Sequence, residues 1–195
     1  MELMKNKYLN SDKDIYFDTD CLATFLLVEK EEIIEKLFKG RIIIPKQVYV
    51  EIEKLVIRKI LKTKPDNFIK NSKAEIYDAM INSDEEKLYE KLVFGENGKS
   101  IGSGEAICIA LAKTFGGILS SNNLKDTCFY IKKYDLESIT TGDILVLALQ
   151  EEIITIDEGK EIWEMMLKYK RKIGPNTFKE YLENYNNSEK CLFIL

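Results

Sequence analysis

Acidic and amide side chains follow short apolar runs at widely separated points of this sequence. Asp18 comes directly after an Ile-Tyr-Phe run, and Glu51 lies two helical turns beyond an Ile-Ile-Ile run. Glu105 opens a strongly apolar segment, and Asn123 follows an Ile-Leu-Ser-Ser run, with Asp126 three residues later. Clustered carboxylates repel one another unless a cation neutralises them, and oxygen ligands favour Mg²⁺ or Mn²⁺. This pattern predicts a metal site suited to phosphodiester chemistry.

The residue types that are missing exclude several other mechanisms. The sequence has no histidine, so a Ser-His-Asp triad, a Cys-His pair and a histidine-ligated zinc site are excluded. Its four cysteines show no Cys-x-x-Cys spacing, which argues against a cysteine zinc site. Acid–base work therefore falls to carboxylates, Lys, Tyr or Cys, or to a metal-activated water.

Size, charge and apolar runs give broader bounds. The chain has 195 residues and a mass of 22.6 kDa, which suits one domain or one domain with an appendage. Its 29 basic and 33 acidic residues give a net charge of -4, so a nucleic-acid surface must be a local patch. The polar N-terminus lacks an apolar signal core, and no apolar run is long enough to span a membrane. We expect a cytoplasmic protein whose Cys21, Cys108 and Cys128 are buried, reduced thiols.

The elements that must position the acids alternate between strands and helices. Short apolar runs predict buried parallel strands at 15–17, 42–44 and 117–121. Helical patterns occupy 20–39 (broken near Glu29), 46–62, 103–115, 124–134 and 143–151. This alternation predicts an α/β fold with a parallel sheet and right-handed crossovers. The acids then meet at the carboxyl ends of the strands, where ligands bind in open sheets.

The remaining segments suggest a boundary and an insert. We expect residues 1–156 to form the α/β domain, with the more polar segment 63–100 outside the sheet as a helical insert, arm or lid. Residues 157–195 are expected to form a C-terminal helical extension, with helices over 157–171 and 177–185.

Four motifs in order resemble the PIN-domain nucleases. They are Phe17-Asp18-Thr19-Asp20, then Pro45-x-x-Val48-x-x-Glu51, then Gly104-Glu105-Ala106-Ile107, then Ile118-Leu119-Ser120-Ser121-Asn122-Asn123. The resemblance covers about residues 13–156. It implies a three-layer α/β/α sandwich with a central parallel sheet and a Mg²⁺- or Mn²⁺-dependent ribonuclease site. It also implies a toxin of a toxin–antitoxin pair, homodimeric and held inactive by an antitoxin protein.

The resemblance also assigns the site residues. Asp18, Glu51 and Glu105 match the family's first three acidic positions, and Asn123 stands where the fourth acid is usual. We expect these four to be catalytic, with the metal held by Asp18, Glu105 and Asp126. The amide at position 123 leaves open a one-metal site, a weak nuclease or an inactive member of the family.

Each assignment has a simpler alternative. Asp18 can be a helix N-cap, and Glu105 can favour the N-terminus of its helix through the dipole. Asn123 can be a turn residue. Thr19 and Ser121, which we expect to contact substrate, can instead bond local backbone. Asp143 follows Gly142 and is expected to cap its helix.

Two basic runs are candidates for contacts with an RNA backbone. The first includes Lys54 and Arg58, and the second includes Lys168, Lys170, Arg171 and Lys172. The leading hypothesis is therefore a metal-dependent endoribonuclease. A PIN-like binding module without catalysis is the second, and a DNA- or structure-specific nuclease with residues 63–100 as a clamp is the third.

Overall fold

The computed structural model describes residues 8–61, 65–95 and 100–185. It contains a five-stranded parallel sheet in the order β3-β2-β1-β4-β5. The strands are β1 (Ile15–Phe17), β2 (Ile42–Pro45), β3 (Glu75–Tyr77), β4 (Ile118–Ser120) and β5 (Glu137–Ile139). The last ten residues of the expected C-terminal extension lie outside the described part of the chain.

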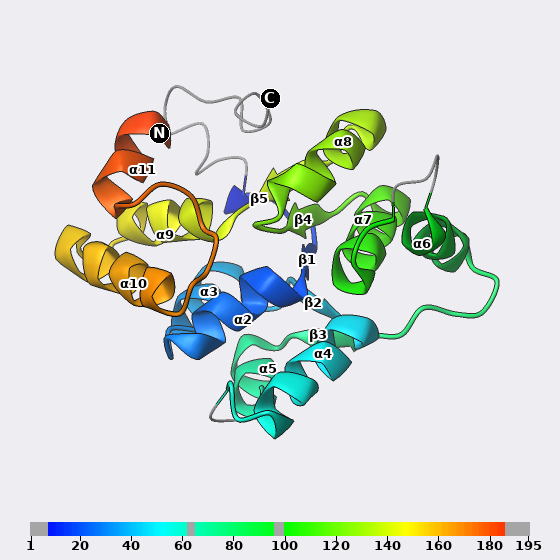
Figure 1. The fold of residues 1–195 in the computed structure, drawn as a ribbon, viewed down its shortest axis with the longest axis horizontal. Coiled ribbons are helices and arrows are strands. Elements are labelled where there is room, and N and C mark those ends of the chain that lie inside the picture. Colours follow the sequence, from blue (N-terminus) through cyan, green and yellow to red (C-terminus); the bar gives the residue numbers. More distant parts are fainter. Residues whose placement is uncertain (1–7, 62–64, 96–99, 186–195) are drawn as a thin grey trace.

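Helices cover both faces of the sheet, as the expected α/β/α sandwich requires (Figure 1). The first are α2 (Thr19–Leu27), α3 (Glu32–Phe38), α4 (Lys46–Ile57), α5 (Asp66–Ser72) and α6 (Asp84–Phe94). They are followed by α7 (Ser103–Phe115), α8 (Leu124–Tyr134), α9 (Thr141–Gln150), α10 (Ile156–Lys168) and α11 (Phe178–Tyr185). The central α7 packs on β1, β2 and β4 with α6 and α8 beside it, whereas α2, α3 and α9 lie on the opposite face.

The middle of the sheet brings distant segments together. β1 pairs with β4 so that Phe17 lies opposite Ser120, and the Asp18 amide donates to the Ser120 carbonyl at 3.0 Å. The chain winds from β1 toward β3 on one side, and β4 and β5 extend the sheet on the other. The carboxyl ends of β1 and β4 therefore form the topological switch point, where open α/β sheets bind ligands.

The expectation that residues 63–100 lie outside the sheet is wrong for part of that segment. Glu75–Tyr77 pairs with Ile43–Pro45 and forms the edge strand β3. Figure 1 shows α5 beside this edge and α6 beside α7, so the segment contributes to both the sheet and a helical layer. A clamp over substrate has no support in this arrangement.

Local sequence explains several helix boundaries. Gly116 has a φ of 75° and ends α7 in the left-handed conformation that suits glycine. Thr140 is the N-cap of α9 and Asp143 bonds back to it, which makes a capping box and confirms that Asp143 helps to cap this helix.

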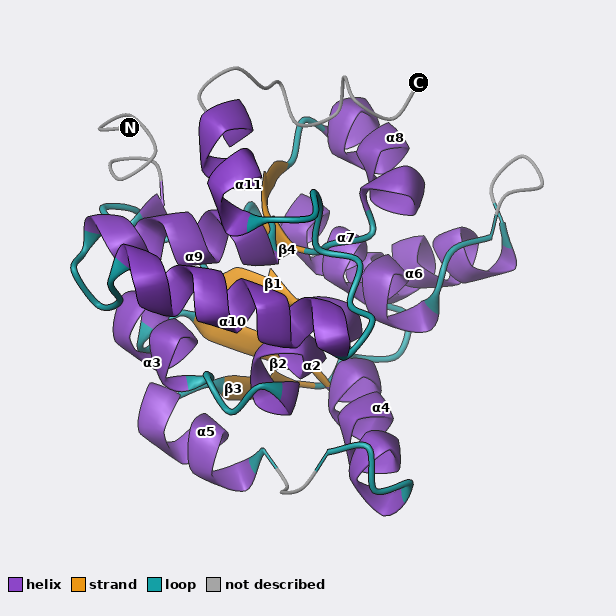
Figure 2. Ribbon diagram, turned by 60° about the vertical axis from the view of Figure 1, so that its left-hand side comes forward, coloured by secondary structure: helices purple, strands orange, loops and turns teal. Residues whose placement is uncertain are grey.

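The C-terminal helices pack onto the same core. Figure 2 shows α10 crossing outside the sheet, where it contacts α2 and α9. Trp163 and Phe178 are fully buried with ring centroids 5.6 Å apart. The Trp163 indole N–H also donates to the Pro175 carbonyl at 3.1 Å, which fixes the loop between α10 and α11.

The structure also tests the predictions about buried thiols and about membrane-spanning segments. Cys21 and Cys108 are buried free thiols, as predicted. Cys128 is disulfide-bonded, so the expectation of a thiol there is wrong. Within the described ranges, no helix has both the length and the apolar character needed to cross a membrane.

Candidate functional site

Asp18 begins the site at the end of β1. It is the N-cap of α2, where its Oδ1 accepts a 2.7 Å hydrogen bond from the Cys21 amide. Asp18 therefore does cap helix α2, which was the simpler alternative for this residue. The side chain is almost fully buried, yet its Oδ2 has no hydrogen-bond partner among the described residues. A buried, unpartnered carboxylate oxygen is unfavourable, so this atom suits a bound cation or a proton.

Burial also changes the charge state of Asp18. Burial is the largest cause that raises the pKa of this carboxyl, and the negative charges of Glu105 and Asp20 add to it; the resulting pKa is about 8, against an ordinary value of 3.8. Hydrogen bonds from the Ser121 side chain and the Cys21 amide partly offset the rise. Without a cation the carboxyl is largely protonated at neutral pH, and a divalent cation would displace that proton.

Glu51 reaches the site from α4 through contact with Thr19. The Thr19 hydroxyl donates a hydrogen bond to the Glu51 carboxylate. Gly104 at the start of α7 permits this contact, because a Cβ there would lie 2.8 Å from the Thr19 hydroxyl and 3.4 Å from Glu51 Oε2. A glycine at this position is thus a packing requirement of the site.

Glu105 in the first turn of α7 contacts Asn123 at the N-cap of α8. The Asn123 side-chain amide donates to Glu105 at 3.2 Å and to Asp126 at 2.8 Å. Asn123 therefore joins two carboxylates through its nitrogen, where an acid would repel both. Asp126 is exposed on α8, and this bond brings it into the group.

The three matched acids all lie close enough to the Cys108 thiol to affect its pKa. Burial raises its pKa well above the usual value, and the charges of Asp18, Glu105 and Glu51 raise it further, in that order. Asp18 follows β1 as the N-cap of α2, Glu105 lies in α7 and Glu51 lies in α4. The acids of three separate sequence motifs thus lie in the neighbourhood of one buried thiol.

The chemistry of this donor set fits a hard divalent cation, although its members are turned toward neighbours. In the part of the chain that the structure describes, no three Asp, Glu, His or Cys side chains form a ready metal-holding group. Glu51 is bonded to Thr19, and Glu105 is bonded to Asn123. The unpartnered Asp18 oxygen is the observation that favours a cation.

The two predicted substrate-contacting hydroxyls already have partners. Thr19 donates to Glu51, and Ser121 bonds Asp18 and accepts from the Asn123 amide at 3.2 Å. Lys54 and Arg58 lie exposed on α4 and at its end. Their substrate-binding role stays a prediction.

A groove of about 930 Å³ is lined on one side by Glu105, Asn123 and Asp126. Its charged lining consists of Asp20, Glu105, Asp126, Lys125, Lys170, Arg171 and Lys172. Arg171 forms an ion pair with Asp20, and the Asn122 side chain donates to the same carboxylate at 3.2 Å. Sequence reasoning singled out the second basic run but missed this pairing, because no sequence signal joins residues 151 positions apart.

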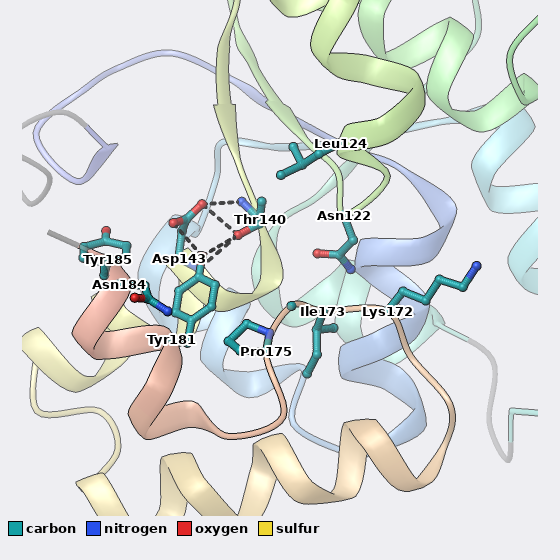
Figure 3. Close-up of a pocket in the computed structure, with 11 residues that line it drawn as sticks. Asn122, Leu124, Thr140, Asp143, Lys172, Ile173, Pro175, Tyr181, Asn184 and Tyr185 are labelled. Atoms are coloured by element: carbon teal, nitrogen blue, oxygen red, sulfur yellow. Dashed lines mark hydrogen bonds between the residues drawn. The ribbon is translucent and has the colours of Figure 1, made fainter. Parts of the chain in front are cut away.

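A smaller cavity of about 300 Å³ adjoins this groove near Asn122 and Lys172 (Figure 3). On its far side from these residues, the buried Asp143 accepts from the Tyr181 hydroxyl at 2.9 Å and the Thr140 amide at 2.7 Å. Burial and the charge of Asp143 raise the pKa of Tyr181. This network ties α11 to the start of α9 and serves the fold.

Comparisons with known proteins agree with this architecture. Residues 14–187 match the model of the DUF3368 family, which is described as a PIN domain. Searches of curated proteins and of solved structures gave no match. PIN domains are generally nucleases that act on nucleic acid and typically use divalent metals. The family match spans most of the chain and includes α10 and α11, and so the chain belongs to the PIN-domain family.

Proposed function

We propose that this protein is a Mg²⁺- or Mn²⁺-dependent endoribonuclease that hydrolyses RNA phosphodiesters. The observation that carries the proposal is the buried Asp18 oxygen without a partner at the switch point of the sheet. Asp18, Glu51 and Glu105 would hold the cation, and Asn123 or Asp126 would complete its surroundings. When bound, such a cation polarises the phosphodiester and lowers the pKa of a neighbouring water.

The other side chains of the site have supporting roles in this proposal. Thr19 orients the Glu51 carboxylate, and the Ser121 side chain orients Asp18. Asn123 keeps Glu105 and Asp126 close in spite of their like charges. The basic residues of the groove are suited to the RNA backbone.

Cleavage of a mixed RNA pool by the purified protein tests the proposal. We expect cleavage with Mg²⁺ or Mn²⁺, none with EDTA, and a loss of activity in Asp18→Asn. The asparagine keeps the size of the side chain and an oxygen that accepts from the Cys21 amide. Single-stranded and duplex DNA of matched sequence, tested in parallel, would reveal a DNA-directed or structure-specific nuclease instead.

A catalytically inactive binding module is the second candidate. It is favoured by the amide at position 123 and by the bonds that hold Glu51 and Glu105 away from a common point. Folded, partner-free protein that binds RNA but cleaves no nucleic acid with any divalent metal would establish this alternative.

We also propose, from the resemblance to PIN toxins, that the protein is the toxin of a toxin–antitoxin pair and acts as a homodimer in the cytoplasm. Induced expression should then arrest bacterial growth, and Asp18→Asn should relieve the arrest. Light scattering on the purified chain measures the dimer directly. Growth unaffected by an active, well-expressed nuclease would contradict the toxin role.

A further inference from the structure

Arg171 is a basic residue of the groove that the fold pairs with an acid close to Asp18. Its guanidinium pairs with Asp20, two residues beyond Asp18. The side chains of Arg171 and Asp20 are 27% and 28% exposed, so the pair lies at the wall of the groove, partly shielded from water. Such a site weakens solvent screening and gives the charge more influence than a surface lysine has.

The end of α10 places this arginine. Lys170 adopts the left-handed conformation with a φ of 56°. Its amide donates to the Leu167 carbonyl at 2.8 Å, and the Arg171 amide donates to the Met166 carbonyl at 3.1 Å. These two bonds are those of a Schellman motif, in which an apolar residue commonly occupies the place of Arg171. Here that residue is an arginine, and its side chain extends from the turn to Asp20 in α2.

The chain beyond Arg171 is fixed as well. Ile173 is 5% exposed and belongs to the core, and Pro175 accepts the Trp163 hydrogen bond. Packed residues therefore fix the backbone of Arg171, and the ion pair with Asp20 fixes its guanidinium. Preorganisation of this kind lowers the entropy lost when a ligand binds.

The ion pair with Asp20 does not use all the hydrogen-bond donors of the guanidinium. One terminal nitrogen donates to Asp20, and the buried Nε has no partner among the described residues. Arginine carries five N–H donors in a planar fork that matches phosphate oxygens. Lys125, Lys170 and Lys172 line the same groove, which concentrates positive charge in a chain of net charge -4.

We propose that Arg171 binds a non-bridging phosphate oxygen of RNA beside the acidic residues, with Asp20 as the residue that positions it. In this assignment Asp20 is an anchor for the arginine and not a metal ligand. Arg171 supplies one fixed positive charge at the scissile region, where Asn123 replaces the usual fourth acid. The assignment rests on the proposed action on RNA.

Binding of a labelled single-stranded RNA of mixed sequence, in EDTA and on an Asp18→Asn background, tests the proposal without cleavage. We expect Arg171→Ala to weaken binding roughly three- to tenfold and to reduce the slope of log affinity against log salt by about one. Arg171→Lys should recover part of the affinity but not all of it, because lysine keeps the charge and loses the fork. Lys160→Ala removes an exposed charge from another part of α10 and is the matched control.

Two further results decide the roles of the pair. In the Asp18-containing protein, Arg171→Ala should raise KM more than it lowers kcat. Asp20→Asn should weaken RNA binding although it removes a negative charge, whereas tighter binding would overturn the positioning role of Asp20. Circular dichroism and the Tm of each variant establish that it is folded, and Arg171→Lys provides the comparison if the alanine variant is not.

Failure of this inference and failure of the proposed function have different signatures. If the protein cleaves RNA but affinity, salt slope and KM are unchanged in Arg171→Ala and Arg171→Lys, Arg171 is a structural residue and the inference is overturned. If no metal supports cleavage but the variants weaken RNA binding as expected, the ribonuclease proposal fails and the phosphate-binding role stands.

Discussion

At the scale of single residues, Asp18 links the fold to the proposed metal. Its pKa of about 8 means that the folded, metal-free protein holds a proton that the unfolded chain releases near its ordinary pKa of 3.8. The stability contributed by this proton therefore falls as the pH rises between those two values. An asparagine side chain cannot ionise, so the Asp18→Asn variant should not share this loss.

We expect the Tm of Asp18→Asn in EDTA to exceed that of the parent protein increasingly between about pH 5 and about pH 8. Each pH unit in this range changes the stability difference by about 1.4 kcal/mol. A change of about 1 kcal/mol shifts the Tm of a chain of this size by roughly 2–4 °C, so the difference should grow by roughly 3–5 °C for each pH unit. Mn²⁺ at the upper end of the range should stabilise the parent protein and not the variant. Parallel Tm curves for the two proteins would contradict the buried, protonated state.

Asn123 gives a second prediction at this scale. Asn123→Asp replaces a donor to Glu105 and Asp126 by a third negative charge, so the variant should unfold at a lower Tm in EDTA. Mn²⁺ should raise its Tm by more than it raises that of the parent, because a cation neutralises the added charge. Asn67→Asp, an exposed position of α5, controls for the change of residue type. An equal metal response in both variants would place the cation elsewhere.

At the scale of elements, the sequence predicts the buried parts of the sheet better than its edges. The three expected strands correspond to β1, β2 and β4, which are buried throughout and composed mainly of apolar residues. β3 and β5 are Glu-Ile-Tyr and Glu-Ser-Ile, lie at the two edges and are largely not buried, so they lack the continuous apolar run. Their pairing depends on tertiary contacts that a local pattern does not contain.

The same distinction applies to the site. Asp18, Glu51 and Glu105 follow recognisable strand and helix patterns, and in the fold all three lie near the Cys108 thiol of α7. The hydrogen bond from Asn123 to Glu105 and the ion pair of Arg171 depend on side-chain geometry across the fold. A sequence read alone supplies candidate charges there, but it does not say which charges meet.

The start of α7 yields a prediction about how one element positions another. Gly104→Ala would introduce a methyl group 2.8 Å from the Thr19 hydroxyl, so the Thr19 side chain must shift and its hydrogen bond to Glu51 is disturbed. Overpacking of this kind costs about 1–3 kcal/mol, and chemical denaturation should show that loss. RNA cleavage should fall in the same variant, whereas Lys113→Ala, at an exposed position of α7, should leave both properties unchanged. Unchanged stability in Gly104→Ala would show that the contact is not close.

At the scale of the whole molecule, the C-terminal helices are part of the core. We expected a boundary after residue 156, yet Trp163, Phe178 and Ile162 are buried in the same hydrophobic cluster as the sheet. Tyr181 closes the Asp143 network from α11, and the loop between α10 and α11 carries Arg171 into the groove. Asp20 from early in the chain and Arg171 from late in the chain thus line one groove.

A chain that ends at residue 156 should therefore not fold cooperatively. Removing one large buried aromatic side chain costs about 3–5 kcal/mol, and this truncation removes both Trp163 and Phe178. Their combined loss is comparable with the whole net stability of a domain, about 5–15 kcal/mol. A cooperative thermal transition in the truncated chain, at the Tm of the full chain, would show instead that α10 and α11 are a separable appendage and that the groove forms without them.

Tyr181→Phe tests the attachment of α11 more mildly. The substitution removes one hydrogen-bond donor from the buried Asp143 and should cost about 1–3 kcal/mol of stability. Tyr169→Phe, at an exposed position, is the control and should leave stability unchanged.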